Sequence, residues 1–255
     1  MQTSLLLAAL LLLQAPAAPL DQVLASVSRN VRDFQDLLPD FVCNEKITST
    51  AYESGKLKET RTVESFFTAV HKPSPGPRGL LVFTETRDIT AIDGILARKG
   101  ARMPKLPAAM FGGFGALLSM TFSPENLQYQ EYELDGILDG GARIAVHFST
   151  KAGQRELRTF LDGEGFNDRD EGMAWIDSAS MQVVRLQRDF FSLPHTLRQL
   201  RNTVDYGSVV IGDRQFWLPR SMRTDVTDRD PRKTKTFLAE YTNCKRFVAE
   251  IRIVP

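Results

Sequence analysis

The residues that could carry out chemistry are few and widely separated. The three histidines are His71, His147 and His195. No carboxylate or second histidine lies at metal-ligand spacing from His147, so we expect a hydrogen-bonded strand residue there and not a general base. The chain contains no Gly-x-Ser-x-Gly elbow, no Walker loop and no His-Glu-x-x-His helix. These observations favour a protein that is not an enzyme and that uses neither cofactor nor metal.

A cluster of carboxylates is the best candidate for a hard cation. Its members are Asp162, Glu164, Asp168, Asp170 and Glu171. The twelve-residue spacing of a calcium loop is absent and Arg169 lies inside the cluster, so we interpret it as a solvated hairpin loop. Two carboxylates could also cleave a glycosidic bond, but nothing in the sequence selects a pair.

The only two cysteines are Cys43 and Cys244. An even pair in an oxidising compartment is most simply a structural disulfide. Two buried free thiols are the alternative. A redox-active pair is not expected, because no Cys-x-x-Cys motif is present.

The N-terminus has the pattern of a secretory signal peptide. An apolar run from Leu5 to Leu13 is followed by Ala15, Pro16 and Ala17, which predicts cleavage before Ala18. No Lys or Arg precedes the run. The run is too short for a transmembrane helix, which needs about 20 residues. We therefore expect a signal peptide over residues 1–17, no transmembrane segment, and a periplasmic or secreted protein.

Composition predicts an ordinary folded domain. The 255 residues include 42% hydrophobic and 25% charged residues, values typical of globular proteins. Lys and Arg number 32 against 31 for Asp and Glu, a balance that argues against a nucleic-acid partner. We expect one β-rich domain over residues 18–255.

One amphipathic helix is expected before the strands begin. Apolar residues follow a spacing of three and four from residue 21 to residue 38, at Leu24, Val27, Val31, Phe34 and Leu38. Asp21 is a candidate N-cap and Pro39 ends the pattern. We expect Leu24, Val31 and Phe34 to be buried.

The remainder of the chain alternates with period two, which predicts an antiparallel sheet and an α+β fold. The expected strands are residues 41–50, 58–71, 79–88, 88–97, 127–134, 142–150, 155–162, 173–177, 182–189, 203–211, 215–226 and 235–254. A short helix is expected within residues 190–202. Pro219 cannot donate a ladder hydrogen bond and therefore predicts a sheet edge or a bulge. We expect Arg185 and Arg188 on the more solvated side of their strand.

The segment from residue 103 to residue 122 interrupts this pattern. It mixes phenylalanine, methionine and leucine with Gly112, Gly113 and Gly115. Such a segment can be a flexible lid over a lipid-sized cavity, because methionine and phenylalanine adapt to chain-like ligands. The alternative is a buried loop packed on the sheet.

Four stretches near the C-terminus resemble the last hairpins of the periplasmic lipoprotein-carrier family, also called the outer-membrane lipoprotein-sorting family. They are Gly172-Met173-Ala174-Trp175-Ile176-Asp177, Val183-Val184-Arg185-Leu186, Tyr206 to Gly212 and Phe216-Trp217-Leu218-Pro219-Arg220-Ser221-Met222. The resemblance covers about a third of the chain at motif level. It implies a strongly curved, open antiparallel sheet, like half a barrel, with helices over an apolar cavity for acyl chains.

The leading hypothesis is an exported binding protein that holds an acyl chain, a lipoprotein-like ligand or another elongated apolar molecule. Candidate lining residues, chosen by hydrophobicity and strand position, are Phe66, Val82, Phe111, Phe114, Phe148, Trp175 and Trp217. The second hypothesis is an envelope structural or interaction domain, whose protein partner contacts the sheet edge or the region of Arg198, Arg201, Arg220 and Arg223. A hydrolase is the third and least favoured.

Overall fold

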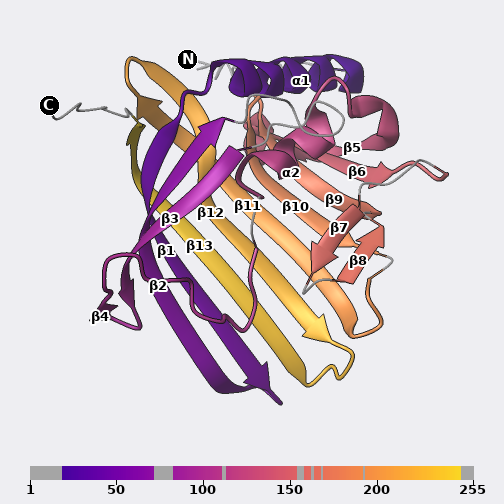
Figure 1. The fold of residues 1–255 in the computed structure, drawn as a ribbon. Helices are drawn as coiled ribbons and strands as arrows, with labels where there is room; N and C mark the ends of the chain where they lie inside the picture. Colours follow the sequence, from indigo (N-terminus) through magenta and orange to yellow (C-terminus); the bar gives the residue numbers. More distant parts are fainter. Residues whose placement is uncertain are drawn as a thin grey trace, which may run out of the picture.

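A large open antiparallel sheet dominates the protein (Figure 1). The structure is a computed structural model that describes residues 19–71, 83–110, 113–153, 158–161, 164–167, 169–191 and 193–247. Eleven strands follow the order β4-β3-β2-β1-β13-β12-β11-β10-β9-β6-β5. The end strands β4 and β5 do not pair with each other, so the sheet is not closed. The predicted antiparallel sheet is therefore confirmed, while the expected leader and residues 248–255 lie outside the described residues.

Most strands overlap the expected ones, but β8 lies where a solvated loop was expected. The strands of the large sheet are β1 Phe41–Glu53, β2 Lys56–His71, β3 Phe83–Ile92, β4 Ile95–Leu96, β5 Gln130–Leu138, β6 Arg143–Thr150, β9 Asp170–Asp177, β10 Val183–Phe190, β11 Leu197–Ile211, β12 Arg214–Asp228 and β13 Lys233–Arg246. A separate hairpin pairs β7 Arg158–Leu161 with β8 Glu164–Asn167. The helices are α1 Leu20–Leu37 and α2 Gly113–Phe122, with short 3₁₀ turns η2 Leu127–Tyr129 and η3 Asp139–Gly141.

Two expected elements are wrong in detail. No bend divides residues 79–97 at Asp88, because β3 runs unbroken to Ile92 and turns at Asp93 and Gly94. The short helix expected within residues 190–202 is replaced by the start of β11 at Leu197, whose long pairing with β12 outweighs the local helical spacing. The bulge expected at Pro219 is confirmed, since the register shifts between Asp205 and Tyr206, opposite Pro219.

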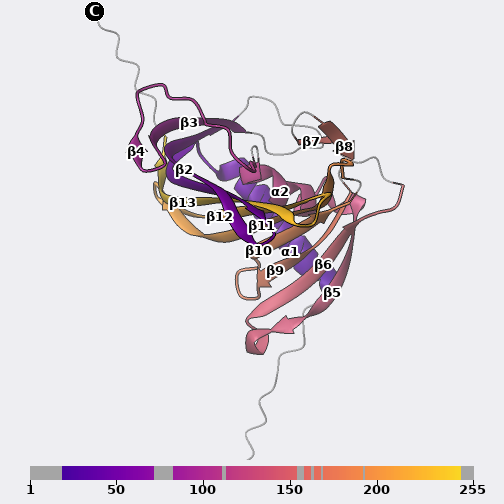
Figure 2. The same ribbon diagram turned by 90° about the horizontal axis from the view of Figure 1, so that it is seen from below.

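Alternation along the strands divides the sheet into an inner and an outer face. On β1, Phe41, Cys43 and Ile47 are buried while the intervening Asn44 and Lys46 are exposed. The buried series continues through the neighbouring strands and joins both helices in one hydrophobic core. Figure 2 shows the sheet curving, with α2 on its concave side, and this concave side is the inner face.

Helix α1 lies across one end of the sheet (Figure 1). Its buried residues are Val23, Val27, Ser28, Val31 and Phe34. The expected stripe is thus shifted at its start, where Val23 is buried and Leu24 is only partly so. Pro19 holds the N-cap position in place of Asp21, and Asp21 lies within the first turn, where a carboxylate favours the helix dipole.

Helix α2 fills the concave face. Phe114 packs between Phe41, Phe67 and Tyr241, with ring centroids 5.0 to 5.3 Å away. At the other end of the helix, Phe122 contacts Phe148 of β6. Because these side chains are buried, the helical part of residues 103–122 is core and matches the buried alternative.

The chain before α2 is also attached to the inner face. Ser49 Oγ of β1 donates a hydrogen bond to the carbonyl oxygen of Ala108 at 2.8 Å and accepts one from its backbone N–H at 3.0 Å. Met103 and Met110 are partly buried against the core. Residues 101–110 therefore cross the sheet as a strap.

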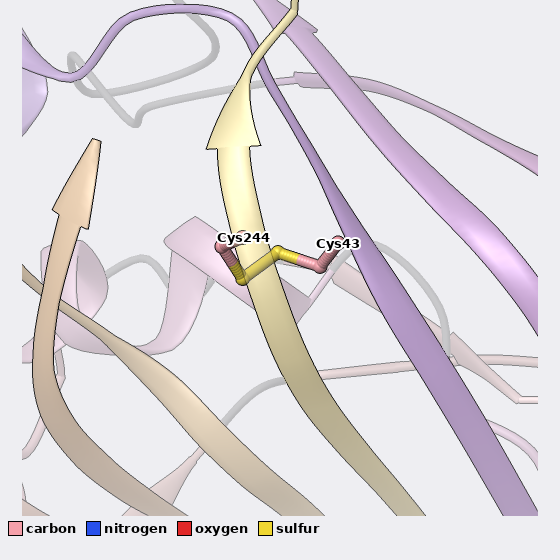
Figure 3. Close-up of a disulfide and its surroundings, with 2 residues drawn as sticks. All are labelled: Cys43 and Cys244. Carbon is pink, nitrogen blue, oxygen red and sulfur yellow. A yellow bond between two sulfur atoms is a disulfide. The ribbon is translucent and has the colours of Figure 1, made fainter. Parts of the chain in front are cut away.

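The expected disulfide is present between Cys43 of β1 and Cys244 of β13 (Figure 3). The two strands are neighbours in the sheet, and the bond lies beside a shift in their register. Neither cysteine is free. The disulfide thus joins the first strand of the sequence to the last, two strands that are neighbours inside the sheet.

Candidate functional site

A pocket of about 310 Å³ opens between α1, α2 and the beginning of β12. Ten residues line it: Asn30, Asp33, Phe34 and Leu37 from α1, Leu118 from α2, Gln182 before β10, and Arg214, Gln215, Phe216 and Trp217 from β12. This volume is at the lower end of the range for small-molecule sites.

The pocket has an apolar floor. Phe34, Leu118 and Phe216 are buried, and Trp217 is partly buried against the same core. Leu37 stands at the last turn of α1, one turn from the buried Phe34, with 49% of its own surface exposed. These side chains offer aromatic and aliphatic surface to an apolar ligand.

Polar side chains complete the lining, and one of them also fixes α1. Asn30 Nδ2 donates hydrogen bonds to the carbonyl oxygens of Ser180 and Met181, at 3.0 and 2.8 Å. These bonds join α1 to the turn between β9 and β10, next to Gln182. Because Asn30 lies one turn from Phe34 on the helix, the same contact positions the apolar floor.

The strands β12 and β13 separate from each other next to the pocket. β12 and β13 pair from Thr227 and Thr234 only as far as Ser221 and Glu240. Beyond that point β12 continues to Arg214 against β11, and β13 continues to Arg246 against β1. The β12 residues that line the pocket belong to this part of the strand, which lacks β13 as a neighbour.

Two ion pairs are buried on the inner face. Arg188 of β10 binds Asp170 of β9, whose carboxylate also accepts a hydrogen bond from Thr150 Oγ1 at 2.6 Å. Elsewhere on the inner face, Arg87 of β3 binds Glu45 of β1 through two nitrogens at 2.7 and 2.8 Å and lies over the Phe67 ring. The concave face is thus filled by core side chains and by paired charges.

Asp170 of the acidic cluster and Arg188 of β10 are buried, although the sequence predicted a solvated environment for both. Asp170 is buried and bound to Arg188, so it is not part of a solvated loop, while Asp162 and Asp168 lie outside the described residues. Arg188 is likewise buried, whereas Arg185 is exposed as expected. Residues three apart on a strand point to opposite faces, which explains the difference. In the part of the chain that the structure describes, no group of acidic, histidine or cysteine residues could hold a metal ion.

The histidines do not assemble a catalytic group with the pocket. His71 Nδ1 lies 3.0 Å from Asp40 Oδ1, and the His71 backbone N–H donates to the same oxygen at 2.8 Å. Burial opposes ionisation of Asp40, but these hydrogen bonds hold the pKa of its carboxyl below the ordinary value. His147 is partly buried beside Met173, and His195 is exposed.

The residues selected from the sequence do not form one site. Trp217 lines the α1–α2–β12 pocket. Phe114 and Phe148 are core residues in contact with other rings. Phe66 and Trp175 lie on the outer face, where the Arg185 guanidinium is 5.8 Å from the Trp175 ring centroid. Val82 and Phe111 lie outside the described residues.

Hydrophobicity identified residues that can be buried but not the face on which each one lies. The α1 contributors Asn30 and Leu37 were missed because they fall outside the apolar stripe of the helix. Arg214 and Gln215 follow a turn at Gly212 and Asp213, and this glycine–aspartate pair was the available signal for a polar rim. Of the four arginines proposed for a partner, Arg201 binds Asp189 and Arg223 binds Asp225.

The structure thus defines an open, curved antiparallel sheet with two helices and a pocket at one end. No protein-family model matches the sequence, and no curated protein does. None of the helices among the described residues is long and apolar enough to cross a membrane.

Solved structures provide distant likenesses. A DUF1329 family protein from Desulfovibrio piger has 13% identity and a TM-score of 0.44, covering 91% of this chain and 95% of its own. An outer membrane lipoprotein-sorting protein domain from Vibrio parahaemolyticus has 13% identity and a TM-score of 0.43, covering 88% and 92%. A LolA superfamily protein from Nitrosomonas europaea has 10% identity and a TM-score of 0.32, covering 92% and 96%. Two of the three thus bear the lipoprotein-sorting or LolA name, and no ligand is carried over from any of them.

Proposed function

We propose that this chain is an exported, single-domain binding protein that holds an acyl chain or another elongated apolar molecule in the α1–α2–β12 pocket. The observation that carries the proposal is the pocket itself, an apolar floor of Phe34, Leu118, Phe216 and Trp217 beneath polar residues. An amphiphile fits such a lining, because its chain can be buried while its polar end remains at the rim. The proposed site lies beside the filled concave face.

Apolar burial supplies the binding energy in this proposal. Each buried methylene group contributes about 0.8 kcal/mol before the costs of association. A pocket of about 310 Å³ accommodates only part of a long chain. Leu118 of α2 forms one wall and limits the space available.

Export is supported by the signal-peptide pattern of residues 1–17 and by the disulfide. A bond between Cys43 and Cys244 persists in a periplasmic or extracellular space but is rarely kept in a reducing cytosol. The proposed location is therefore the periplasm or the exterior of the cell.

Binding is proposed in place of catalysis because of the pocket's polar residues. They are Asn30, Asp33, Gln182, Arg214 and Gln215, a set without histidine, cysteine or serine. Asn30 is already engaged in fixing α1. Such a set can orient a ligand, but its single carboxylate, Asp33, has no second carboxylate beside it to form the pair that a glycosidase uses.

Native mass spectrometry of the protein purified from its own host tests the proposal. We expect a bound amphiphile that lipid extraction recovers. Leu37→Glu should reduce its occupancy at least several-fold, because it places a charge at the pocket edge. Leu57→Glu, at an equally exposed leucine in β2, is the matched control. Recovery without a ligand, or equal occupancy in both variants, would contradict the proposed function.

A further inference from the structure

A second hollow, of about 450 Å³, lies on the outer face of the sheet and is separate from the α1–α2–β12 pocket. Nine residues line it: Asn44, Glu45, Lys46, Glu64, Ser65, Phe66, Thr90, Glu240 and Thr242. Of these, Glu45 and Ser65 are buried, and their side chains are hydrogen-bonded to each other on the inner face. Phe66 is 49% exposed, which is unusual for a phenylalanine in the middle of a sheet. We call this site the Phe66 hollow.

Strand register arranges the hollow in two rows across β2, β1 and β13. In one row, Phe66 is paired with Asn44, and Asn44 with Thr242. The shorter asparagine and threonine side chains leave space beside the phenylalanine ring. This difference in side-chain size accounts for a concavity on a sheet surface that no helix covers among the described residues.

The other row carries charge. Lys46 is paired with Glu64 on one side and with Glu240 on the other. On the next strand, Asp88 of β3 is paired with Phe66 and is exposed. Two carboxylates therefore flank the Lys46 ammonium group, a third lies beside Phe66, and the site as a whole is acidic.

An aromatic ring beside carboxylates is suited to a cation. A guanidinium stacked on a phenylalanine face gains cation–π attraction, and nearby carboxylates add charge-assisted hydrogen bonds. Arginine is the better fit because its flat group can stack and bind a carboxylate at the same time. Open space beside Phe66 is the volume that such a group would occupy.

We propose that the Phe66 hollow binds an arginine side chain of a basic segment in a partner protein. The guanidinium stacks on Phe66 and pairs with Asp88 and Glu64, while Lys46 limits the affinity by competing for the glutamates. The proposal does not depend on an apolar ligand in the other pocket, because the two sites share no lining residue.

The test is an NMR titration of the full chain with a hexapeptide of alternating arginine and threonine, at physiological salt. We expect saturable shifts of the amides of Asn44, Lys46, Phe66 and Thr242. Phe66→Ala should weaken binding about five-fold through the lost cation–π and apolar contacts. The exposed Val210 of β11 supplies the control, since Val210→Ala should leave binding unchanged.

Lys46→Ala gives a result that a damaged fold cannot imitate. Removing the only cation of the row should strengthen binding of the arginine peptide about two- to three-fold. A matching glutamate–threonine hexapeptide should produce no saturable shifts.

Three outcomes would overturn the proposal. The first is equal affinity in wild type and Phe66→Ala. The second is binding of the arginine peptide that is spread over all acidic surfaces and lost at physiological salt. The third is self-association through Phe66, detected by sedimentation of the wild type but not of Phe66→Ala, which would identify a second copy of this chain as the occupant.

Discussion

The ring of Phe114 in α2 meets the ring of Tyr241 in β13 edge to face, with centroids 5.0 Å apart and planes at 90°. This contact places α2 directly on the concave face of the sheet. Phe67 and Phe41 surround the same ring, so the helix belongs to the core and does not cover an empty cavity. The pocket for a ligand lies instead at the end of the sheet, where Leu118 of α2 faces α1 and β12.

Truncation of Phe114 is expected to be costly. Phe114→Ala should lower the free energy of unfolding by about 3–5 kcal/mol, the range for a buried phenylalanine that leaves a cavity. Chemical denaturation followed by circular dichroism measures the change. The exposed Phe66 is the matched control, and Phe66→Ala should change stability by about 0.5 kcal/mol or less. A loss below 1 kcal/mol for Phe114→Ala would contradict the packing of α2.

Gly172 of β9 is expected to tolerate no side chain. A Cβ at this position would overlap the carbonyl oxygen of Gln187 and approach Phe148 Cζ to 2.6 Å. Gly172→Ala should therefore destabilise the protein by about 1–3 kcal/mol, the range for an overpacked core. At Gly136 of β5 a Cβ would meet nothing within 4 Å, so Gly136→Ala should be close to neutral or slightly stabilising. Thermal unfolding of the two variants compares them, and equal melting temperatures would refute the close approach at Gly172.

The disulfide should contribute strongly to stability. It closes a loop between residues 201 positions apart, which corresponds to an upper value on the order of 5 kcal/mol in the chain-entropy model. We expect Cys43→Ser with Cys244→Ser to lose a few kcal/mol, and a reductant to have the same effect on the wild type. Urea unfolding of all three samples measures it. A double variant within 1 kcal/mol of wild type would show that the pairing of β1 with β13 suffices.

Three of the five tyrosines should make the protein sensitive to alkali. Burial raises the pKa of Tyr132, Tyr206 and Tyr241 well above the ordinary value of 10.0. Below pH 10 these groups are protonated in both states and cost no stability. Above about pH 10 the unfolded chain alone ionises them, so the free energy of unfolding falls as pH rises, by at most about 4 kcal/mol per pH unit.

Ultraviolet difference spectra of tyrosinate, recorded during alkaline titration, check this sensitivity. The signal of three tyrosines should appear together with loss of circular dichroism. Ionisation of all five tyrosines while the sheet remains folded would be inconsistent with the burial of these side chains.

The sequence predicted elements well where hydrophobic periodicity alone determines which face of a strand or helix is buried. Period-two alternation located β1, β2 and β12, because each residue on those strands either faces the core or faces away from it. The helical spacing of Val27, Val31 and Phe34 located α1 for the same reason. Two cysteines in a chain with a leader pattern were enough to predict their bond.

Prediction from sequence was poorer where packing between segments that are distant in the sequence determines which side chains are buried. Phe114 and Trp217 are both apolar, but only the final arrangement of α2 and β12 places one in the core and the other at the pocket. Phe66 is as apolar as a core residue, but its pairing with Asn44 places it on the outer face of the sheet, where it is exposed. The pairing of Arg188 with Asp170 depends on β9 and β10 being neighbours, which sequence spacing does not reveal.

Fluorescence of the two tryptophans tests the proposed ligand site most directly. Trp175→Phe leaves Trp217 of the α1–α2–β12 pocket as the sole tryptophan, and Trp217→Phe leaves Trp175 on the outer face. A fatty acid that carries bromine on its chain, added below its aggregation concentration, quenches an indole only on close contact. We predict saturable quenching in Trp175→Phe and none in Trp217→Phe. Equal quenching of the two variants, or none in either, would contradict the binding of an apolar chain at this pocket.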